Sequence, residues 1–179
     1  MNNGPKLTDT TPVSAPTPAE REAMADAICL ADETGALGNV PVGALVLYQG
    51  QRLSGASNLR HVLRDPTAHA ELIALRVAAR ARDTWRLDGA TLIVTLEPCG
   101  MCAEAIIQTR IRRVVIGAPT PTIGDGQKSM GMEIQGGGGA KRLRAAGVEV
   151  IEGVLEQECI ALLTRFFSKL RGAGCGGTR

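Results

Sequence analysis

Segments of strand length alternate with segments of helical periodicity along most of this chain, and this alternation constrains the fold more than any other feature. Apolar residues at helical spacing predict helices over residues 19–34, 68–82, 102–109 and 155–170. Short runs of strand character predict strands over residues 42–48, 52–57, 91–96, 113–117 and 148–151. The first two strands flank Gln49–Gly50, which predicts a hairpin turn between them.

A hairpin followed by alternating helices and strands predicts an α/β fold, in which helices cover both faces of one sheet. Because crossovers are right-handed, the later strands are expected to be parallel to one another. The sequence thus predicts a three-layer α/β/α domain with a five-stranded mixed sheet. Residues 118–140 contain Pro119, Pro121 and the run Gly136–Gly139, so they are predicted to form a long irregular stretch of the kind that is often functional.

Length and composition indicate one globular domain with a tail at each end. The chain has 179 residues, of which 44% are hydrophobic and 21% charged, and this composition excludes a wholly disordered protein. Residues 1–18 are predicted to be a disordered tail and residues 171–179 a flexible Gly-rich tail, so that the domain spans residues 19–170. No apolar run approaches the ~18–20 residues of a membrane span, so no membrane contact is expected.

Charge and cysteine content narrow the function classes. The net charge of +2 argues against a strongly basic, histone-like binder, and 2% aromatic residues argue against a stacking platform built on many rings. The five cysteines are an odd, scattered set, and the first residues do not resemble a signal peptide, so no disulfide framework is expected. A reducing cytoplasm is predicted, where a closely spaced cysteine pair indicates metal binding or redox activity.

Two short segments supply the residue types that zinc prefers. The first, DPTAHAE, contains His69 and Glu71, and the second, TLEPCGMC, contains Cys99 and Cys102. One imidazole and two thiolates suit zinc, and three protein ligands leave a fourth position for water, as in catalytic sites. Zinc lowers the pKa of such a water molecule to about 7 and so provides a nucleophile at neutral pH. The two segments together predict a catalytic zinc site with one ion per chain.

Helix geometry sets a condition on this site. Cys99 and Cys102 are three residues apart and therefore share a helix face. His69 and Glu71 are two apart, so both reach one pocket only if His69 lies at the start of its helix and the pocket lies off the helix end. Thr67 is the predicted N-cap, which places the helix start near His69.

Each part of the pattern also has a simpler interpretation. A Cys-x-x-Cys pair alone is more often redox-active or structural. Pro98 suits the first position of the second helix, and its neighbour Glu97 is interpreted as a residue that orients the turn. A structural zinc site would need a fourth protein ligand, but His61 is the only other histidine, and Cys29 and Cys159 are predicted at core-facing helix positions. The combination of both segments favours catalysis.

His-x-Glu together with Pro-Cys-x-x-Cys is the signature of zinc-dependent deaminases. The chain resembles the cytidine deaminase-like superfamily and, within it, is most similar to the bacterial tRNA-specific adenosine deaminases. The resemblance extends from about residue 20 to residue 171. The matching segments are Val40–Val46, Asn58, Asp65–Glu71, Ala90–Ile106, Arg110–Ala118 and Glu158–Phe167.

The resemblance implies roles for individual residues. His69, Cys99 and Cys102 would hold zinc. Glu71 would take a proton from the attacking water and deliver it to the ring nitrogen and the leaving amine. Asn58 would hydrogen-bond the base, since a carboxamide both donates and accepts. The resemblance also implies a homodimer that converts adenosine to inosine in a tRNA anticodon loop, where the base is already unstacked.

The segment after Ala118 departs from the tRNA-editing enzymes, which usually carry an Asp and a Lys where this chain has Pro119–Gly124. Residues 136–159 also resemble the deaminase half of the bifunctional riboflavin-pathway enzymes, although those usually have an insertion between the two zinc cysteines. One alternative is therefore a deaminase of a free nucleobase, nucleoside or small pathway metabolite, such as guanine, cytosine or a riboflavin-pathway pyrimidine. An alternative of another class is a non-catalytic zinc-bearing binding subunit, against which the presence of Glu71 argues.

Basic side chains that could contact an RNA backbone occur mainly in the second half of the chain. They are Arg110, Arg112, Arg113, Lys141, Arg142, Arg144, Lys169 and Arg171. For any one of them a solvated surface position is an equally simple interpretation, and the sequence leaves open whether they share a face.

Overall fold

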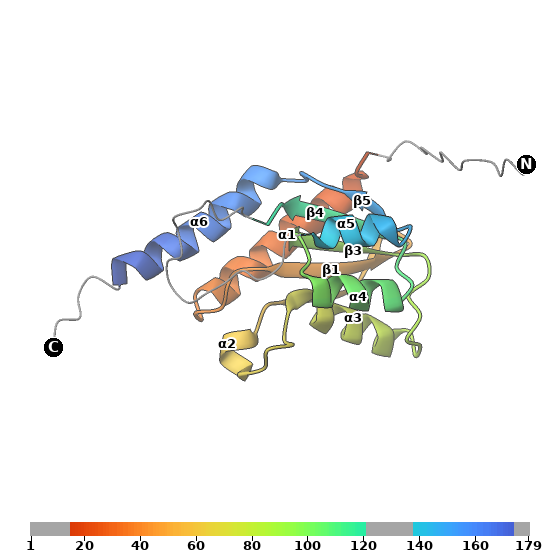
Figure 1. The fold of residues 1–179 in the computed structure, drawn as a ribbon, viewed down its shortest axis with the longest axis horizontal. Coiled ribbons are helices and arrows are strands. Elements are labelled where there is room, and N and C mark those ends of the chain that lie inside the picture. The colour runs from red at the N-terminus through yellow and green to blue at the C-terminus, as the bar shows by residue number, and fades with distance from the viewer. Residues whose placement is uncertain (1–14, 121–137, 174–179) are drawn as a thin grey trace, which may run out of the picture.

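A computed structural model describes residues 15–120 and 138–173 of the chain. The helices and strands follow one another in the alternating order expected from the sequence (Figure 1). The elements are α1 (Pro18–Gly35), β1 (Gly43–Tyr48), β2 (Gln51–Ser57), α2 (Arg60–Leu63), α3 (Ala70–Ala81), β3 (Ala90–Leu96), α4 (Gly100–Gln108), β4 (Arg113–Ala118), α5 (Gly139–Ala145), β5 (Glu149–Ile151) and α6 (Glu156–Ala173). All the predicted helices and strands are present, with ends that differ by three residues at most.

The strands form a five-stranded mixed sheet in the order β2-β1-β3-β4-β5. β1 is antiparallel to both β2 and β3, whereas β3, β4 and β5 are parallel to one another. The turn between β1 and β2 has φ values of 51° at Gln49 and 76° at Gly50, and a type I′ hairpin turn requires positive φ at both positions. The predicted hairpin and the predicted parallel direction of the later strands are confirmed.

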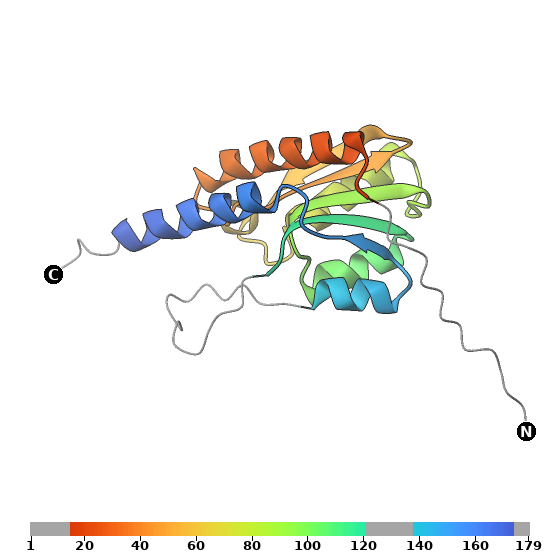
Figure 2. The same ribbon diagram turned by 90° about the horizontal axis from the view of Figure 1, so that it is seen from above.

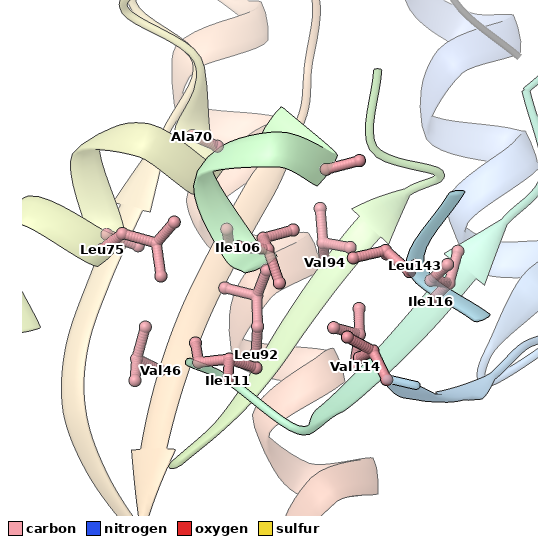
Figure 3. Close-up of a cluster of buried hydrophobic side chains, with 14 of the residues drawn as sticks. Val46, Ala70, Leu75, Leu92, Val94, Ile106, Ile111, Val114, Ile116 and Leu143 are labelled. Atoms are coloured by element: carbon pink, nitrogen blue, oxygen red, sulfur yellow. The ribbon is translucent and has the colours of Figure 1, made fainter. Parts of the chain in front are cut away.

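Helices cover both faces of this sheet and complete the predicted three-layer α/β/α arrangement (Figure 2). α1 and α6 lie on one face, and α3, α4 and α5 lie on the other. Successive residues of a strand point to opposite faces, so each central strand contributes to two cores. Leu92 and Val94 of β3 belong to the core beneath α3, α4 and α5 (Figure 3), whereas Ile93 packs on the opposite face with Met24 and Val115.

The connection from β3 to β4 determines where a functional site can form. α4 joins these two parallel strands, so its N-terminus lies at the carboxyl end of β3. α3 packs against β1, β2 and α4 on the same face of the sheet. The carboxyl ends of parallel strands are the usual place for ligand sites in open α/β sheets. The two segments with candidate zinc ligands, 65–71 and 95–102, meet at this end.

Two short helices are absent from the sequence-based prediction. α2 has four residues and α5 has seven, too few to reveal a helical period. α5 begins directly after Gly138, which has a φ of 100°, and it buries the side chains of Ala140 and Leu143. Residues 139 and 140, which were predicted to be irregular, are therefore helical, and residues 121–137 of the predicted irregular stretch lie outside the described residues.

Both predicted tails lie mostly outside the described residues. α1 begins at Pro18, after Thr17, and a capping box joins Thr17 to Glu20. α6 continues to Ala173, three residues past the predicted end of the domain at residue 170. None of the helices in the described ranges is both long and apolar enough to cross a membrane.

Candidate metal centre and active site

Three of the predicted site residues converge on one point. Nδ1 of His69 lies 3.8 Å from Sγ of Cys99 and 3.5 Å from Sγ of Cys102. The ligand atoms of all three residues lie within 4.8 Å of one another. Around a tetrahedral zinc ion, with bonds of about 2.1 Å to nitrogen and about 2.3 Å to sulfur, nitrogen and sulfur would be about 3.6 Å apart. The donor atoms therefore fit a zinc ion in both type and spacing.

Two of these ligands are N-cap residues, which explains how side chains from different helices reach the same point. His69 precedes α3 with φ −73° and ψ 148°, and Cys99 precedes α4 with φ −72° and ψ 171°. At these two described positions neither side chain caps its own helix, as Ser, Thr or Asp commonly would. Both side chains consequently remain available to a metal. Cys102 lies in the first turn of α4 and completes the set.

α3 starts two residues later than predicted, because its N-cap is His69 instead of Thr67. α4 starts at Gly100, between Pro98, which suits the first helical position, and residue 102, where the helical period was predicted to begin. Thr67 is not the N-cap of α3, because its N–H and its hydroxyl each donate to Oδ1 of Asp65 at 2.7 Å and hold it in a preceding turn. Pro98 likewise lies before the N-cap of α4. The later start puts His69 at the helix end, which is the condition set by its spacing from Glu71.

Hydrogen bonds within the triad favour a thiolate. The hydrogen bond with the Cys102 thiol lowers the pKa of Cys99 to about 3, assisted by His69 and opposed by burial. The same hydrogen bond raises the pKa of Cys102, as does its burial. The hydrogen bond with Cys99 also raises the pKa of His69, against the effect of burial. One sulfur is thus held in the ionised form that binds metals.

Glu71 lies beside the ligands, in hydrogen-bond contact with Cys102. Only 4% of its surface is exposed. Burial raises the pKa of its carboxyl, opposed by a hydrogen bond with its own backbone N–H and by the charge of His69. A carboxylate whose pKa is raised is a stronger proton acceptor than an ordinary glutamate. Glu71 is thus a candidate proton acceptor beside the possible metal site.

Asn58, the predicted substrate contact, is buried at the start of the segment that leads to the site. Its Nδ2 donates to the carbonyl of Val40 at 2.9 Å, and its Oδ1 accepts from the N–H of Arg60 at 3.4 Å. The next residue, Leu59, donates its N–H to the carbonyl of Ala68, directly before the metal ligand at position 69. The Asn58 side chain is therefore fixed, and its amide retains one N–H and acceptor capacity for a further partner.

Glu97 makes more contacts at the site than the sequence predicts. Its carboxylate accepts backbone N–H groups from Thr120 at 3.2 Å, Gly138 at 3.0 Å and Ala140 at 3.1 Å. Burial would raise the pKa of Glu97, but these hydrogen bonds outweigh it and lower the pKa. The only sequence signal for this role is the position of Glu97 two residues before Cys99, because all three partners follow more than 20 residues later.

The remaining candidate ligands do not take part. Within the described residues, the triad is the one group of His, Cys, Asp and Glu side chains close enough together to hold a metal. Cys159 is buried as predicted, but Cys29 is exposed, so its predicted core-facing position is wrong. The buried stripe of α1 passes instead through Ala27 and Ala31. With three ligands and no fourth in the described part of the chain, the site has the open arrangement of catalytic zinc centres.

Several of the predicted RNA-contacting residues are engaged within the fold. Ion pairs with acidic side chains join Arg113 to Glu20 and Glu149, Arg142 to Glu104, and Arg144 to Glu152. The side chain of Arg171 lies outside the described residues. Arg60, which the sequence did not single out, lies close enough to His69 for its charge to oppose protonation of the imidazole.

The region with the triad matches a known family. A family model of the cytidine and deoxycytidylate deaminase zinc-binding region matches residues 18–118, which include the three ligands and Glu71. The chain belongs to this deaminase family. The deaminase is a zinc-dependent hydrolase that acts on C–N bonds, as the resemblance in sequence implied.

Individual relatives of this deaminase are similar over most of its length. It is 40% identical over 148 residues to a protein of Bacillus subtilis called tRNA-specific adenosine deaminase, covering 83% of this chain and 88% of the relative. A structure from a study of A-to-I editing by tRNA:A34 deaminases has a TM-score of 0.69 and 34% identity, with coverage of 79% of this chain and 99% of the other. A guanine deaminase from Nitrosomonas europaea has a TM-score of 0.71 and 26% identity, with coverage of 86% of each chain.

Proposed function

We propose that this deaminase converts adenosine to inosine in a tRNA anticodon loop. Deamination is supported most directly by the meeting of His69, Cys99 and Cys102 beside the buried Glu71. The choice of tRNA is supported by the relative named tRNA-specific adenosine deaminase, which is 40% identical to this chain. An anticodon base is already unstacked, so its entry into the site costs little free energy.

In this proposal His69, Cys99 and Cys102 would hold one zinc ion per chain, and the bound ion would supply a water of lowered pKa as the nucleophile at neutral pH. Glu71 accepts one proton of the attacking water and donates it to N1 of the adenine ring. As the C6–O bond forms and the C6–N bond breaks, Glu71 moves the second proton to the departing amine. Adenosine and water thereby yield inosine and ammonia.

Asn58 is proposed to orient the base. Its amide group is held at both ends, by the carbonyl of Val40 and the N–H of Arg60. A fixed carboxamide loses little conformational entropy when it binds a purine edge. Replacement of Asn58 by Ala is expected to raise KM and lower kcat together, because both binding and orientation of the base suffer.

A cation next to the site favours a polyanionic substrate over a free base. Arg60 is exposed, and its charge reaches His69. It forms no ion pair within the described residues. A guanidinium group in this place is suited to a phosphate of a bound polynucleotide.

The deciding experiment compares ammonia release from two kinds of substrate. One is an anticodon stem-loop with adenosine at the wobble position, and the other is a panel of free adenine, guanine, cytosine and their nucleosides. Turnover is expected on the stem-loop only. Turnover confined to the free compounds would reject the tRNA proposal, and a stem-loop with inosine already in place serves as the blank.

The second candidate is a deaminase of a free purine. It is favoured by the structural similarity to the guanine deaminase of Nitrosomonas europaea, with a TM-score of 0.71, and by the absence of Asp and Lys from Pro119–Gly124. A non-catalytic binding subunit is a third candidate, and it would release no ammonia from any of these substrates. The buried Glu71 argues against it, because a binding subunit does not need a proton shuttle.

We further propose a cytoplasmic homodimer whose catalytic domain spans residues 19–170. A tRNA substrate supports the location. Large apolar side chains are exposed on α2 at Val62 and Leu63, and on α4 at Met101, which supports an interface near the site. Light scattering coupled to size exclusion is expected to give the mass of two chains, and a monomer over the micromolar range would reject the dimer.

A further inference from the structure

Glu97 joins three separate parts of the chain at the metal centre. It follows the last residue of β3 and precedes Cys99 by two positions. Its backbone N–H donates to the carbonyl of Ala118 at 2.9 Å, at the end of the parallel neighbour β4. The backbone of Glu97 therefore continues the β3–β4 pairing beyond the sheet, up to the metal ligand.

The side chain of Glu97 adds two further connections. Oε2 accepts the N–H of Thr120, which follows β4, and Oε1 accepts the N–H groups of Gly138 and Ala140 at the start of α5. The carboxylate thus satisfies N–H groups that α5 cannot pair internally, although it comes from a different segment. One carboxylate holds the end of β4 and the start of α5 together.

The residue between Glu97 and the metal ligand is held from the same side. Pro98 is buried, and its carbonyl oxygen packs so closely on Gly139 that a Cβ at position 139 would overlap it. Glu97 keeps Gly139 in this place by bonding both of its neighbours, Gly138 and Ala140. The segment Glu97–Pro98 is consequently fixed between β4 and α5.

Cys99 depends on this segment for its position. It is the N-cap of α4, so its own N–H is not part of the helix, and its side chain makes no capping bond that would hold it. The carbonyl of Cys99 accepts the N–H of Ala103 at 2.8 Å, so the helix holds its C-terminal side. The backbone that enters from Pro98 determines the other side, and both together place Sγ relative to His69 and Cys102. A shift of that backbone would change the 3.8 Å separation between Sγ of Cys99 and Nδ1 of His69.

We propose that Glu97 is a positioning residue of the zinc centre, which sets the place of Cys99 by binding the main chain of Thr120, Gly138 and Ala140. The proposal rests on Cys99 as a zinc ligand and is independent of the choice between tRNA and a free base as substrate. Residues of this kind, which orient a metal ligand without touching the metal, typically change metal affinity about 10–100-fold when they are replaced.

The test compares Glu97→Gln with Glu104→Gln. The amide of Glu97→Gln would present an NH₂ group to at least one of the three N–H donors and break that hydrogen bond. Glu104 is a matched control, because it also links α4 to α5, through Arg142 at 2.6 Å, but it lies in the helix beyond the metal ligands. Zinc affinity is measured by competition with a chromophoric chelator, together with thermal unfolding of the zinc-free and zinc-loaded protein.

Glu97→Gln is expected to weaken zinc binding about 10–100-fold, whereas Glu104→Gln leaves it within about twofold. The variant is also expected to destabilise the zinc-loaded protein more than the zinc-free protein. Equal destabilisation of both forms with unchanged zinc affinity would overturn the proposal and leave Glu97 a purely structural residue.

Glu97→Asp provides a second measurement should Glu97→Gln fail to fold. It keeps the charge and both acceptor atoms but is one methylene shorter, so a smaller loss of zinc affinity is expected, and wild-type affinity would equally overturn the proposal. If the wild-type protein binds zinc but deaminates no tRNA, the tRNA proposal is rejected. The comparison of zinc affinities between the Glu97 and Glu104 variants still tests the role of Glu97, because it does not depend on the substrate.

Discussion

Two partly buried polar clusters lie at opposite ends of the parallel strands, and they differ in how completely their charges are paired. At the amino ends of β4 and β5, Arg113 binds Glu20 at 2.6 Å and Glu149 at 2.7 Å. Its side chain is 17% exposed and that of Glu20 is 6% exposed. At the carboxyl ends, Glu71 lies beside the three candidate zinc ligands, with no lysine or arginine paired to it in the described residues.

Under the proposed function, the difference separates groups that stabilise the fold from groups that react. Arg113 has two carboxylates as partners, so neither sign of charge is left unpaired, and the cluster fastens α1 to the edge of the sheet. Glu71 is buried beside two sulfurs and an imidazole, which raises the free energy of its ionised form. A site that binds a dication and moves protons needs such incompletely paired groups, and the surrounding fold must hold them in place.

The largest effect is expected from Glu71→Gln, which removes the proton shuttle and keeps the shape of the side chain. We expect kcat to fall about 10²–10⁴-fold, the range attributed to general acid–base catalysis. Zinc content is expected to stay near one per chain, and the thermal midpoint of the zinc-free protein to be unchanged or higher, because a buried carboxyl with no lysine or arginine partner in the described residues is replaced by a neutral amide. Ammonia release, metal analysis and thermal unfolding measure the three quantities, and retained turnover would contradict the role of Glu71.

A smaller effect, on stability instead of activity, is expected from Arg113→Met. The variant leaves Glu20 and Glu149 without their common cation, which is expected to cost about 2–4 kcal/mol, toward the lower part of the range for buried pairs because Glu149 is partly exposed. Urea unfolding measures the loss, and kcat is expected to remain unchanged. Arg144→Met, which breaks only the exposed pair with Glu152, is the control and is expected to cost less than about 1 kcal/mol. Equal losses in both variants would remove the contrast between the two kinds of pair.

The smallest effect concerns acid stability. Burial would raise the pKa of Glu20, but hydrogen bonds from Arg113 and Thr17 outweigh burial and lower it below the ordinary value of 4.5. A carboxyl with a lowered pKa stabilises the fold above the unfolded-state value, and this contribution is lost as the pH falls through the folded-state value. The difference in unfolding free energy between wild type and Glu20→Gln is therefore expected to be constant near neutral pH and to shrink below pH 4.5. A difference that does not change with pH would show that Glu20 acts through packing alone.

Long apolar periodicity made most of the fold predictable. Apolar residues recur with the period of the element in the strands around Leu92 and Val115 and in the helix around Leu75, and these residues are buried in the structure. The period can be recognised because a buried face needs several apolar residues in register. α2 and α5 were missed because four or seven residues bury too few side chains to form a pattern. The prediction for Cys29 was wrong because the buried stripe of α1 consists, beyond Met24, mainly of alanines, which have little hydrophobic signal.

The convergence of the three candidate zinc ligands was predictable for a different reason. His69, Cys99 and Cys102 are chemically distinctive, and each pair of functional residues lies within four positions of a helix start. The exact start of α3 was not predictable. The N–H and the hydroxyl of Thr67 both donate to Asp65 in a turn, and this turn prevents Thr67 from capping the helix. That turn moves the N-cap to His69 and gives the ligand its orientation.

The sequence by itself determined the chemistry of the centre, since the donor atoms of an imidazole, two thiols and a carboxyl are properties of the residue types. Only the tertiary structure decided what holds them in place. The partners of Glu97 are the backbone N–H groups of Thr120, Gly138 and Ala140. Every residue except proline has a backbone N–H, so the residue types at positions 120, 138 and 140 do not predict a contact with Glu97. Only the tertiary structure, which brings these distant segments together, shows the contact.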